Sequence, residues 1–246
     1  MRKSALFFAL LCLSISALAQ SSPQVVSQVS IAMPKPGMAA QFEAGRKEHS
    51  AFHGTQKDTW SIYVWEFISG ERTGGYMMAS PGHNWKDFDT REEFNKLDTP
   101  NIATTYGAVT ESTASAYYVF RDDLSQTKPP AVPAKMRTTS TYVVIPEHVN
   151  DFTDAIKKIN AAIKKTNYPV KPSRWYSLAN GGETPTFVLI TDRAGWADME
   201  PPEKKMEEML KEAYGDSSAV EQLRRSCRKI TTELSKFRPD LSYMPK

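Results

Sequence analysis

An internal repeat with a period near 110 residues constrains the fold of this chain more than any other sequence feature. Phe42 corresponds to Phe152 at an offset of 110. Four further pairs follow in the same order at an offset of 111: Trp65 with Tyr176, Tyr76 with Phe187, Trp85 with Trp196, and Asp87 with Asp198. Residues 120–125 (FRDDLS) return as residues 237–242 (FRPDLS) at an offset of 117. Because the pairs are colinear with a single shift, we predict two copies of one structural unit.

The boundary between the copies falls in a proline-rich stretch. Residues 125–135 hold three prolines in a polar run, which is the composition of a stiff, extended linker. We therefore expect a first unit over residues 20–124 and a second unit over residues 136–246.

Residues 1–19 have the pattern of a cleaved export signal. Arg2 and Lys3 precede an apolar stretch too short to cross a bilayer, and residues 17–19 form an Ala-x-Ala site, so we expect cleavage after Ala19. This predicts a periplasmic or secreted protein without membrane association after cleavage. Loss of the two N-terminal cations lowers the net charge from +3 to +1, a balance that offers no general attraction for nucleic acid.

Hydrophobic patterning gives both copies the same order of elements, βαββαβ. In the first copy we expect strands at 24–33, 59–68, 75–80 and 112–121, a helix at 38–53, and a second helix from 84 to about 106 that is broken near Pro100. In the second copy we expect strands at 137–145, 173–179, 186–191 and 231–238, a helix at 148–165, and helices within 196–229. The spacing within 231–238 also fits a helix, but the repeat favours a strand. The predicted class is α+β, with two tandem ferredoxin-like units.

Two short motifs of the chain are similar to motifs of a known protein family. Residues 29–43 (VSIAMPKPGMAAQFE) combine a strand that ends in Pro-Gly with a helix that begins with Phe-Glu. Residues 85–88 (WKDF) and 196–199 (WADM) have the form of the start of a second helix. These motifs resemble those of dimeric α+β barrel proteins of the antibiotic-biosynthesis-monooxygenase and NIPSNAP type. The resemblance implies that the two units of this chain form an intramolecular dimeric α+β barrel.

The resemblance implies several activities without choosing among them, because one fold carries many functions. The superfamily includes cofactor-independent oxygenases, haem-degrading enzymes, chlorite-dismutase-like haem proteins and members with no known activity. A chlorite-dismutase-like protein needs a haem-binding histidine in the second copy, and residues 149–246 contain none. Haem is therefore possible as a cofactor but has no support from a second-unit histidine.

The first helices of the two copies differ most on their apolar face. In the second copy this face carries Ile156, Ile159 and Ile163, and the first copy has Arg46, His49 and His53 at the same positions. Full burial of these polar groups without partners costs several kcal/mol. We therefore predict a pocket between helix 38–53 and the first sheet, with strand residues in its wall: Tyr63, Trp65, Glu66 and Tyr76.

The predicted pocket has a functional and a structural interpretation. In the functional one, His49 or His53 binds haem or a metal or transfers a proton, while Arg46 binds a carboxylate or an oxyanion. In the structural one, the three side chains lie at the solvated margin of a shorter or tilted helix. Local spacing offers His49 and His53 no third ligand for zinc, so the sequence predicts no metal site.

Three functions remain open from the sequence. The favoured one is small-molecule binding through the first-unit pocket. The alternatives are a cofactor-independent or haem-dependent oxygenase and a structural or interaction protein with no ligand site. The sequence assigns no catalytic residue, does not decide between enzyme and binding protein, and allows a monomer or a homodimer whose partner is a small molecule rather than nucleic acid.

Overall fold

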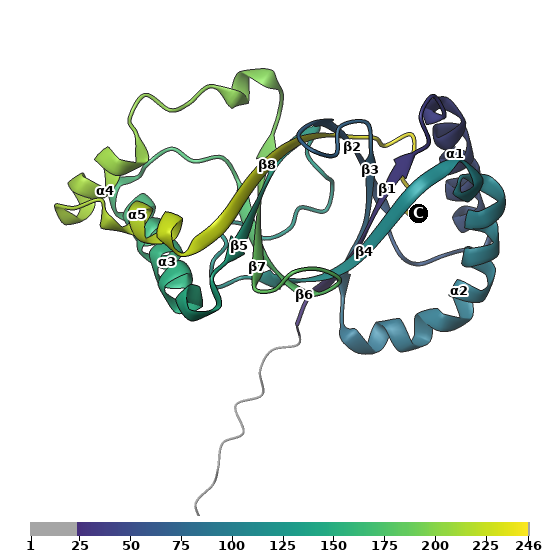
Figure 1. Ribbon diagram of the computed structural model, residues 1–246, viewed down its shortest axis with the longest axis horizontal. Helices are drawn as coiled ribbons and strands as arrows, with labels where there is room; N and C mark the ends of the chain where they lie inside the picture. Colours follow the sequence, from purple (N-terminus) through teal and green to yellow (C-terminus); the bar gives the residue numbers. More distant parts are fainter. Residues whose placement is uncertain (1–23, 246) are drawn as a thin grey trace, which may run out of the picture.

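The computed structural model describes residues 24–245, so the predicted export signal at 1–19 lies outside the described residues. Eight strands close into a barrel in the order β1-β3-β2-β8-β5-β7-β6-β4, and every neighbouring pair is antiparallel. The helices lie outside the barrel on two opposite sides (Figure 1). No helix of the described part combines the length and apolar character that a membrane span requires.

Both units follow the predicted βαββαβ order. The first consists of β1 (Val26–Pro34), α1 (Ala39–Thr55), β2 (Tyr63–Ser69), β3 (Tyr76–His83), α2 (Trp85–Thr105), the short 3-10 helix η1 (Gly107–Val109) and β4 (Thr110–Arg121). The second consists of β5 (Met136–Val144), η2 (Pro146–His148), α3 (Val149–Thr166), β6 (Ser173–Asn180), β7 (Thr186–Arg193), η3 (Trp196–Met199), α4 (Met206–Tyr214), α5 (Ser218–Arg225) and β8 (Cys227–Phe237). The α+β prediction is confirmed, and β8 is the strand that the repeat favoured over a helix.

One predicted feature of the first unit is wrong, because α2 continues through Pro100 without a break. A proline inside a helix lacks the N–H that would bond to the carbonyl four residues earlier. That carbonyl belongs to Lys96, which is exposed, so water can replace the missing donor.

Equivalent aromatic residues of the repeat occupy equivalent places in the two cores. Phe42 of α1 stacks on Tyr76 of β3 with ring centroids 4.7 Å apart, and Phe152 of α3 contacts Phe187 of β7 at 5.0 Å. Both phenylalanines are fully buried between their helix and their half of the barrel. The offsets read from the sequence therefore correspond to positions in space.

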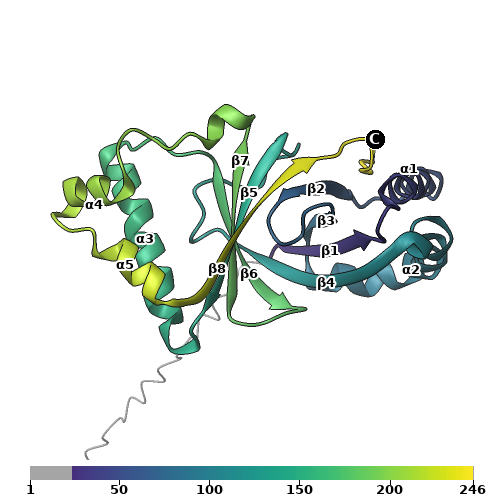
Figure 2. The same ribbon diagram turned by 45° about the horizontal axis from the view of Figure 1, so that its top comes forward.

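Each unit ends in a segment that packs on the other unit. Leu124, which follows β4, is fully buried in the core of the second unit against Phe152. Leu241, which follows β8, is fully buried in the core of the first unit against Phe42. Figure 2 shows this C-terminal segment leaving β8 and passing β2 toward α1. The two units thus exchange leucines, and each core is complete only when the other unit is folded.

The repeated FRxDLS segment fixes this exchange through its polar side chains. Ser125 Oγ accepts a hydrogen bond from the backbone N–H of Trp175 at 2.8 Å, and Ser242 Oγ accepts one from that of Val64 at 2.9 Å. In each segment the arginine pairs with the aspartate two residues later. The segment therefore has a structural role, because it holds the end of each unit against a strand of the other unit.

The outer helices, α2 in the first unit and α4 and α5 in the second, pack on their unit through different interactions. In the second unit Ile159 and Ile163 of α3 lie in one apolar cluster with Met209 and Leu210 of α4. In the first unit α2 has no buried residue. It meets α1 at a close backbone contact and through polar side chains, so its position depends less on hydrophobic burial.

The close contact between α1 and α2 occurs at Gly45. A Cβ atom on this residue would lie 2.7 Å from the backbone oxygen of Thr105, which is too short for a real contact. We expect Gly45→Ala to lower the free energy of unfolding by about 1–3 kcal/mol, measured by urea denaturation. Gly54→Ala in the same helix is the control: its Cβ would meet only Tyr243 at 3.8 Å, and it should stabilise by up to about 1 kcal/mol. Equal stability of the two variants would contradict the tight packing.

Candidate functional site

The barrel encloses a cavity of about 120 Å³ that is lined by residues of both units. The first unit contributes mainly apolar side chains, among them Val29, Ile31, Trp65 and Met77. The second unit contributes most of the polar side chains, among them Arg137, Thr139, Arg174 and Asp192, and also apolar ones such as Val188. Prolines of the segment between β4 and β5 also line it: Pro129, Pro130 and Pro133. Apolar and charged side chains therefore both face the cavity.

Arg137 of β5 is the most unusual group of this cavity. Only 7% of the residue is exposed, and its guanidinium carbon lies 3.5 Å from the centroid of the Trp65 ring. Its Nη2 atom is 3.1 Å from the sulfur of Met77, and its Nε atom has no hydrogen-bond partner. Within residues 24–245 no carboxylate forms an ion pair with Arg137. Burial lowers the pKa of Arg137 to about 9, so the side chain still carries its charge at neutral pH.

Two neighbours of Arg137 also leave buried polar atoms without partners. These are the indole nitrogen of Trp65 and the hydroxyl of Thr139, both on residues that line the cavity. A buried donor without a partner costs about 1–3 kcal/mol, so folded proteins keep few of them. Arg174, in contrast, forms two hydrogen bonds of 2.7 and 2.5 Å with Asp192. Three unpaired polar atoms, on Arg137, Trp65 and Thr139, therefore gather at the cavity, and the Nε atom of Arg46 is a further unpaired donor outside it.

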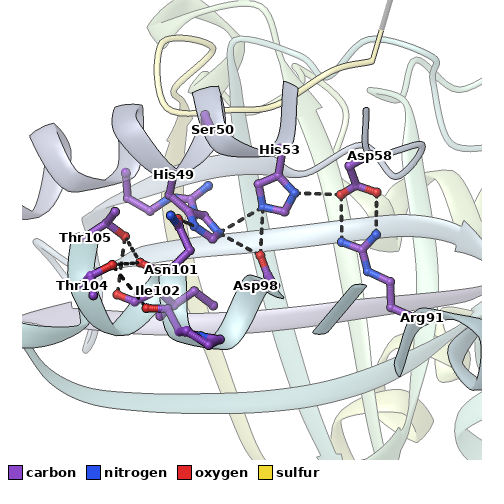
Figure 3. Close-up of polar contacts among 12 residues, drawn as sticks. His49, Ser50, His53, Asp58, Arg91, Asp98, Asn101, Ile102, Thr104 and Thr105 are labelled. Atoms are coloured by element: carbon purple, nitrogen blue, oxygen red, sulfur yellow. Dashed lines mark hydrogen bonds and ion pairs between the residues drawn. The ribbon is translucent and has the colours of Figure 1, made fainter. Parts of the chain in front are cut away.

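The structure distributes the seven residues of the predicted pocket over three places instead of one. Tyr63 and Trp65 line the barrel cavity. Glu66 and Tyr76 lie on the helix-facing side of the same sheet, because successive residues of a strand face opposite sides. His49 and His53 lie between α1 and α2 (Figure 3), and Arg46 of α1 contacts Leu241 and the Tyr106 ring.

Glu66 and Tyr76 belong to an ion-pair network that closes the first unit. Glu43 of α1 accepts a hydrogen bond of 2.6 Å from the Tyr76 hydroxyl. Arg238, which follows β8, bonds to Glu43 at 2.5 and 2.8 Å and to Glu66 at 3.0 Å. The hydrogen bond from Arg238 lowers the pKa of Glu43 and outweighs the effect of burial. These residues hold the second unit's chain end against α1.

Arg46, His49 and His53 are buried, with 1%, 2% and 0% exposed, and do not lie at a solvated margin. Arg46 donates to the backbone oxygen of Leu241 at 3.3 Å. Burial, together with the charge of Arg46, lowers the pKa of His49 to about 3, so His49 is neutral at physiological pH.

Partners from outside α1 satisfy the outer nitrogens of both histidines (Figure 3). His53 Nδ1 donates to Asp58 at 2.7 Å, and Asp58 in turn accepts two hydrogen bonds from Arg91 of α2. Burial opposes the charge on Asp58, but the hydrogen bonds from His53 and Arg91 prevail and lower its pKa. His49 Nδ1 lies 2.7 Å from the side-chain oxygen of Asn101. The helices are thus joined by polar contacts.

Sequence reasoning missed the α2 residues of this cluster. Arg91, Phe94, Asp98 and Asn101 follow one another at spacings of 3, 4 and 3, which places them on one helix face. Matching that polar face to the unusual face of helix 38–53 was the available signal. The loop residue Asp58 gave no such signal.

No family model and no curated protein matches the sequence. Solved structures nevertheless match nearly the whole chain. A mutant chlorite dismutase from Candidatus Nitrospira defluvii aligns with a TM-score of 0.58 at 9% identity, covering 89% of this chain and 94% of that one. The chain has the dimeric α+β barrel fold. An anthrone oxidase-like protein (TM-score 0.56, 12% identity, 88% and 92% covered) and a monooxygenase candidate from Lactobacillus acidophilus (0.54, 5%, 90% and 97%) support the same barrel. Identities this low show the fold alone.

The haem that the family resemblance implies does not fit the second unit of this barrel. Between α3 and its sheet the space is filled by Phe152, Ile156, Trp175 and Phe187, all buried. The last histidine of the sequence, His148, precedes α3, and about half of its side chain is exposed. The second unit therefore offers no histidine as a haem ligand.

Two of the arginines that line the cavity, Arg137 and Arg174, should respond oppositely to replacement by methionine. Arg137→Met removes a desolvated charge without a carboxylate partner, so we expect the ligand-free protein to gain about 1 kcal/mol or more. Arg174→Met leaves Asp192 without its partner and should cost about 3 kcal/mol. Urea unfolding of both variants measures the difference. A loss of stability in Arg137→Met as large as that in Arg174→Met would show that Arg137 is a structural residue.

Proposed function

We propose that this protein binds a small apolar carboxylate, or an amphipathic anion of similar size, inside the barrel. The observation that carries this proposal is the buried guanidinium of Arg137, which has an unpaired Nε atom and no carboxylate partner within the described chain. Keeping a charge in such a place is unfavourable unless a counterion binds there. An anionic ligand supplies that counterion.

The surrounding walls favour an anion that also has an apolar body. The guanidinium fork suits a carboxylate, which can accept two parallel hydrogen bonds from it. Thr139 and the Trp65 indole offer further donors close by. Val29, Ile31 and Val188 supply apolar surface for a hydrocarbon or aromatic body. Pockets with mostly apolar walls and a few convergent polar groups are typical of small-molecule sites.

This proposal keeps the predicted class of function but moves its location. The sequence placed the pocket between helix 38–53 and the first sheet, on the side where Glu66 and Tyr76 lie. The cavity that supports binding lies on the other face of that sheet, and of the predicted residues it contains Tyr63 and Trp65. Polar partners occupy the surroundings of Arg46, His49 and His53.

Titration with paired ligands tests the proposal. Benzoate, naphthoate and octanoate should bind saturably and quench tryptophan fluorescence, and the quenching should disappear in Trp65→Phe. The matching alcohols should bind at least about tenfold more weakly, because a charge-assisted hydrogen bond contributes about 1.5–3 kcal/mol. Arg137→Met should bind carboxylates about tenfold or more weakly while its binding of the alcohols stays unchanged.

Arg121→Met serves as the matched control for this titration, because Arg121 forms an exposed pair with Asp123 and does not line the cavity. It should bind carboxylates like the original protein. Equal affinity for carboxylates and alcohols, or the absence of saturable binding by every carboxylate tested, would refute the proposal.

A further inference from the structure

We propose that His49, His53 and Asp98 form a binding site for a divalent transition-metal ion, with Zn²⁺ as the ion that the spacing fits. The site lies between α1 and α2, on the opposite side of the sheet from the barrel cavity, and does not depend on the proposed carboxylate binding. Sequence spacing offered the two histidines no third ligand, and the fold brings Asp98 to them from the next helix (Figure 3).

The hydrogen-bond partners of the histidines fix where their protons lie. His53 Nδ1 faces the carboxylate of Asp58, which can only accept, so Nδ1 carries the hydrogen. His49 Nδ1 faces the side-chain oxygen of Asn101, so it also carries the hydrogen. On both rings the Nε2 atom is therefore the one that can serve as a metal ligand. The two Nε2 atoms lie 3.0 Å apart.

Asp98 adds a third acceptor at the same point. Its Oδ1 atom lies 3.4 Å from Nε2 of His49 and 3.4 Å from Nε2 of His53. This oxygen is buried and accepts no hydrogen bond. Two ring nitrogens and one carboxylate oxygen thus meet at the centre of a buried cluster. A cation at this point would be held by all three atoms, and a metal ion is the cation that we propose.

The distances fit a metal ion. Zinc binds histidine nitrogen and carboxylate oxygen at about 2.0–2.2 Å in tetrahedral geometry, which places neighbouring ligand atoms about 3.3 Å apart. The three separations, 3.0, 3.4 and 3.4 Å, lie around this value. Two imidazoles and one carboxylate also form a ligand set that zinc accepts, with a fourth position left for water or another small ligand.

The Nδ1 atom of each histidine has the kind of hydrogen-bond partner that is typical of metal-binding histidines. Metal-binding histidines usually donate their other ring N–H to a carboxylate or a carbonyl oxygen, which fixes the ring and its tautomer. His53 has this contact with Asp58, and Arg91 holds Asp58 in turn. His49 has the equivalent contact with Asn101. Both ligand rings are therefore oriented before any ion binds.

Comparison of the two units indicates what the ion does. At the positions of His49 and His53 the second unit has Ile159 and Ile163, which pack on α4 through an apolar cluster. The first unit lacks this cluster, and α2 has no buried residue of its own. An ion held by two residues of α1 and by Asp98 of α2 would tie the helices together. We infer a structural role, in which the metal takes the place of hydrophobic docking.

Metal titration of the full chain, stripped beforehand with EDTA, tests this site. We expect one Zn²⁺ per chain with a submicromolar Kd, a rise in unfolding temperature on zinc addition, and a tetrahedral absorption spectrum with Co²⁺. Asp98→Asn should weaken zinc binding by at least about 100-fold and abolish the zinc-dependent rise.

Asp89→Asn is the matched control, since Asp89 lies exposed on the same helix. It should bind zinc like the original protein. Far-UV circular dichroism establishes that each variant is folded, and carboxylate binding in the barrel should be unchanged in Asp98→Asn. Absence of stoichiometric zinc and cobalt binding by the original chain, or equal affinity in Asp98→Asn, would overturn the proposal and leave a proton shared within the cluster as the bridging cation.

Discussion

The exchange of chain ends between the two units is the constraint on which the rest of this structure depends. Leu124 completes the core of the second unit, and Leu241 completes that of the first. Neither core can be dry and close-packed while the units stand apart, so closure of the barrel and packing of the cores occur together. The barrel cavity exists because the pairing of β2 with β8 and of β4 with β6 closes the strands of both units around it.

The buried charged groups of this protein are of two kinds, those with an oppositely charged partner and those without one. Arg174 has a carboxylate partner and is explained by the fold itself. Arg137 has no carboxylate partner among the described residues, and Arg137 Nε and Asp98 Oδ1 are buried without a hydrogen-bond partner. Proteins keep buried polar groups unsatisfied mainly where another species binds. The two proposals therefore call for opposite species, an anion in the barrel and a cation between the helices, and each can fail without the other.

Much of the fold could be predicted from the sequence. The paired positions of Phe42 and Phe152 gave the duplication, and it correctly assigned β8 as a strand where local periodicity also fitted a helix. The site was predicted less well. Arg46, His49 and His53 were recognised as unusual by comparison with three isoleucines, but Arg137 was not, because it belongs to an ordinary strand pattern with nothing local to mark it. Arg137 lacks a carboxylate partner because of the side chains that surround it, and strands far apart in the sequence contribute these side chains.

The sequence by itself determined the order of elements, the equivalence of the two units and the anomaly on the first helix, because these follow from local spacing and from comparing one half with the other. Only the tertiary structure decided which face of the first sheet carries the cavity and that Asp98 meets the two histidines. Register sets which strand residues face inward, and the docking of α2 sets which side chains converge. Both depend on contacts between residues far apart in the chain, which spacing along the sequence does not encode.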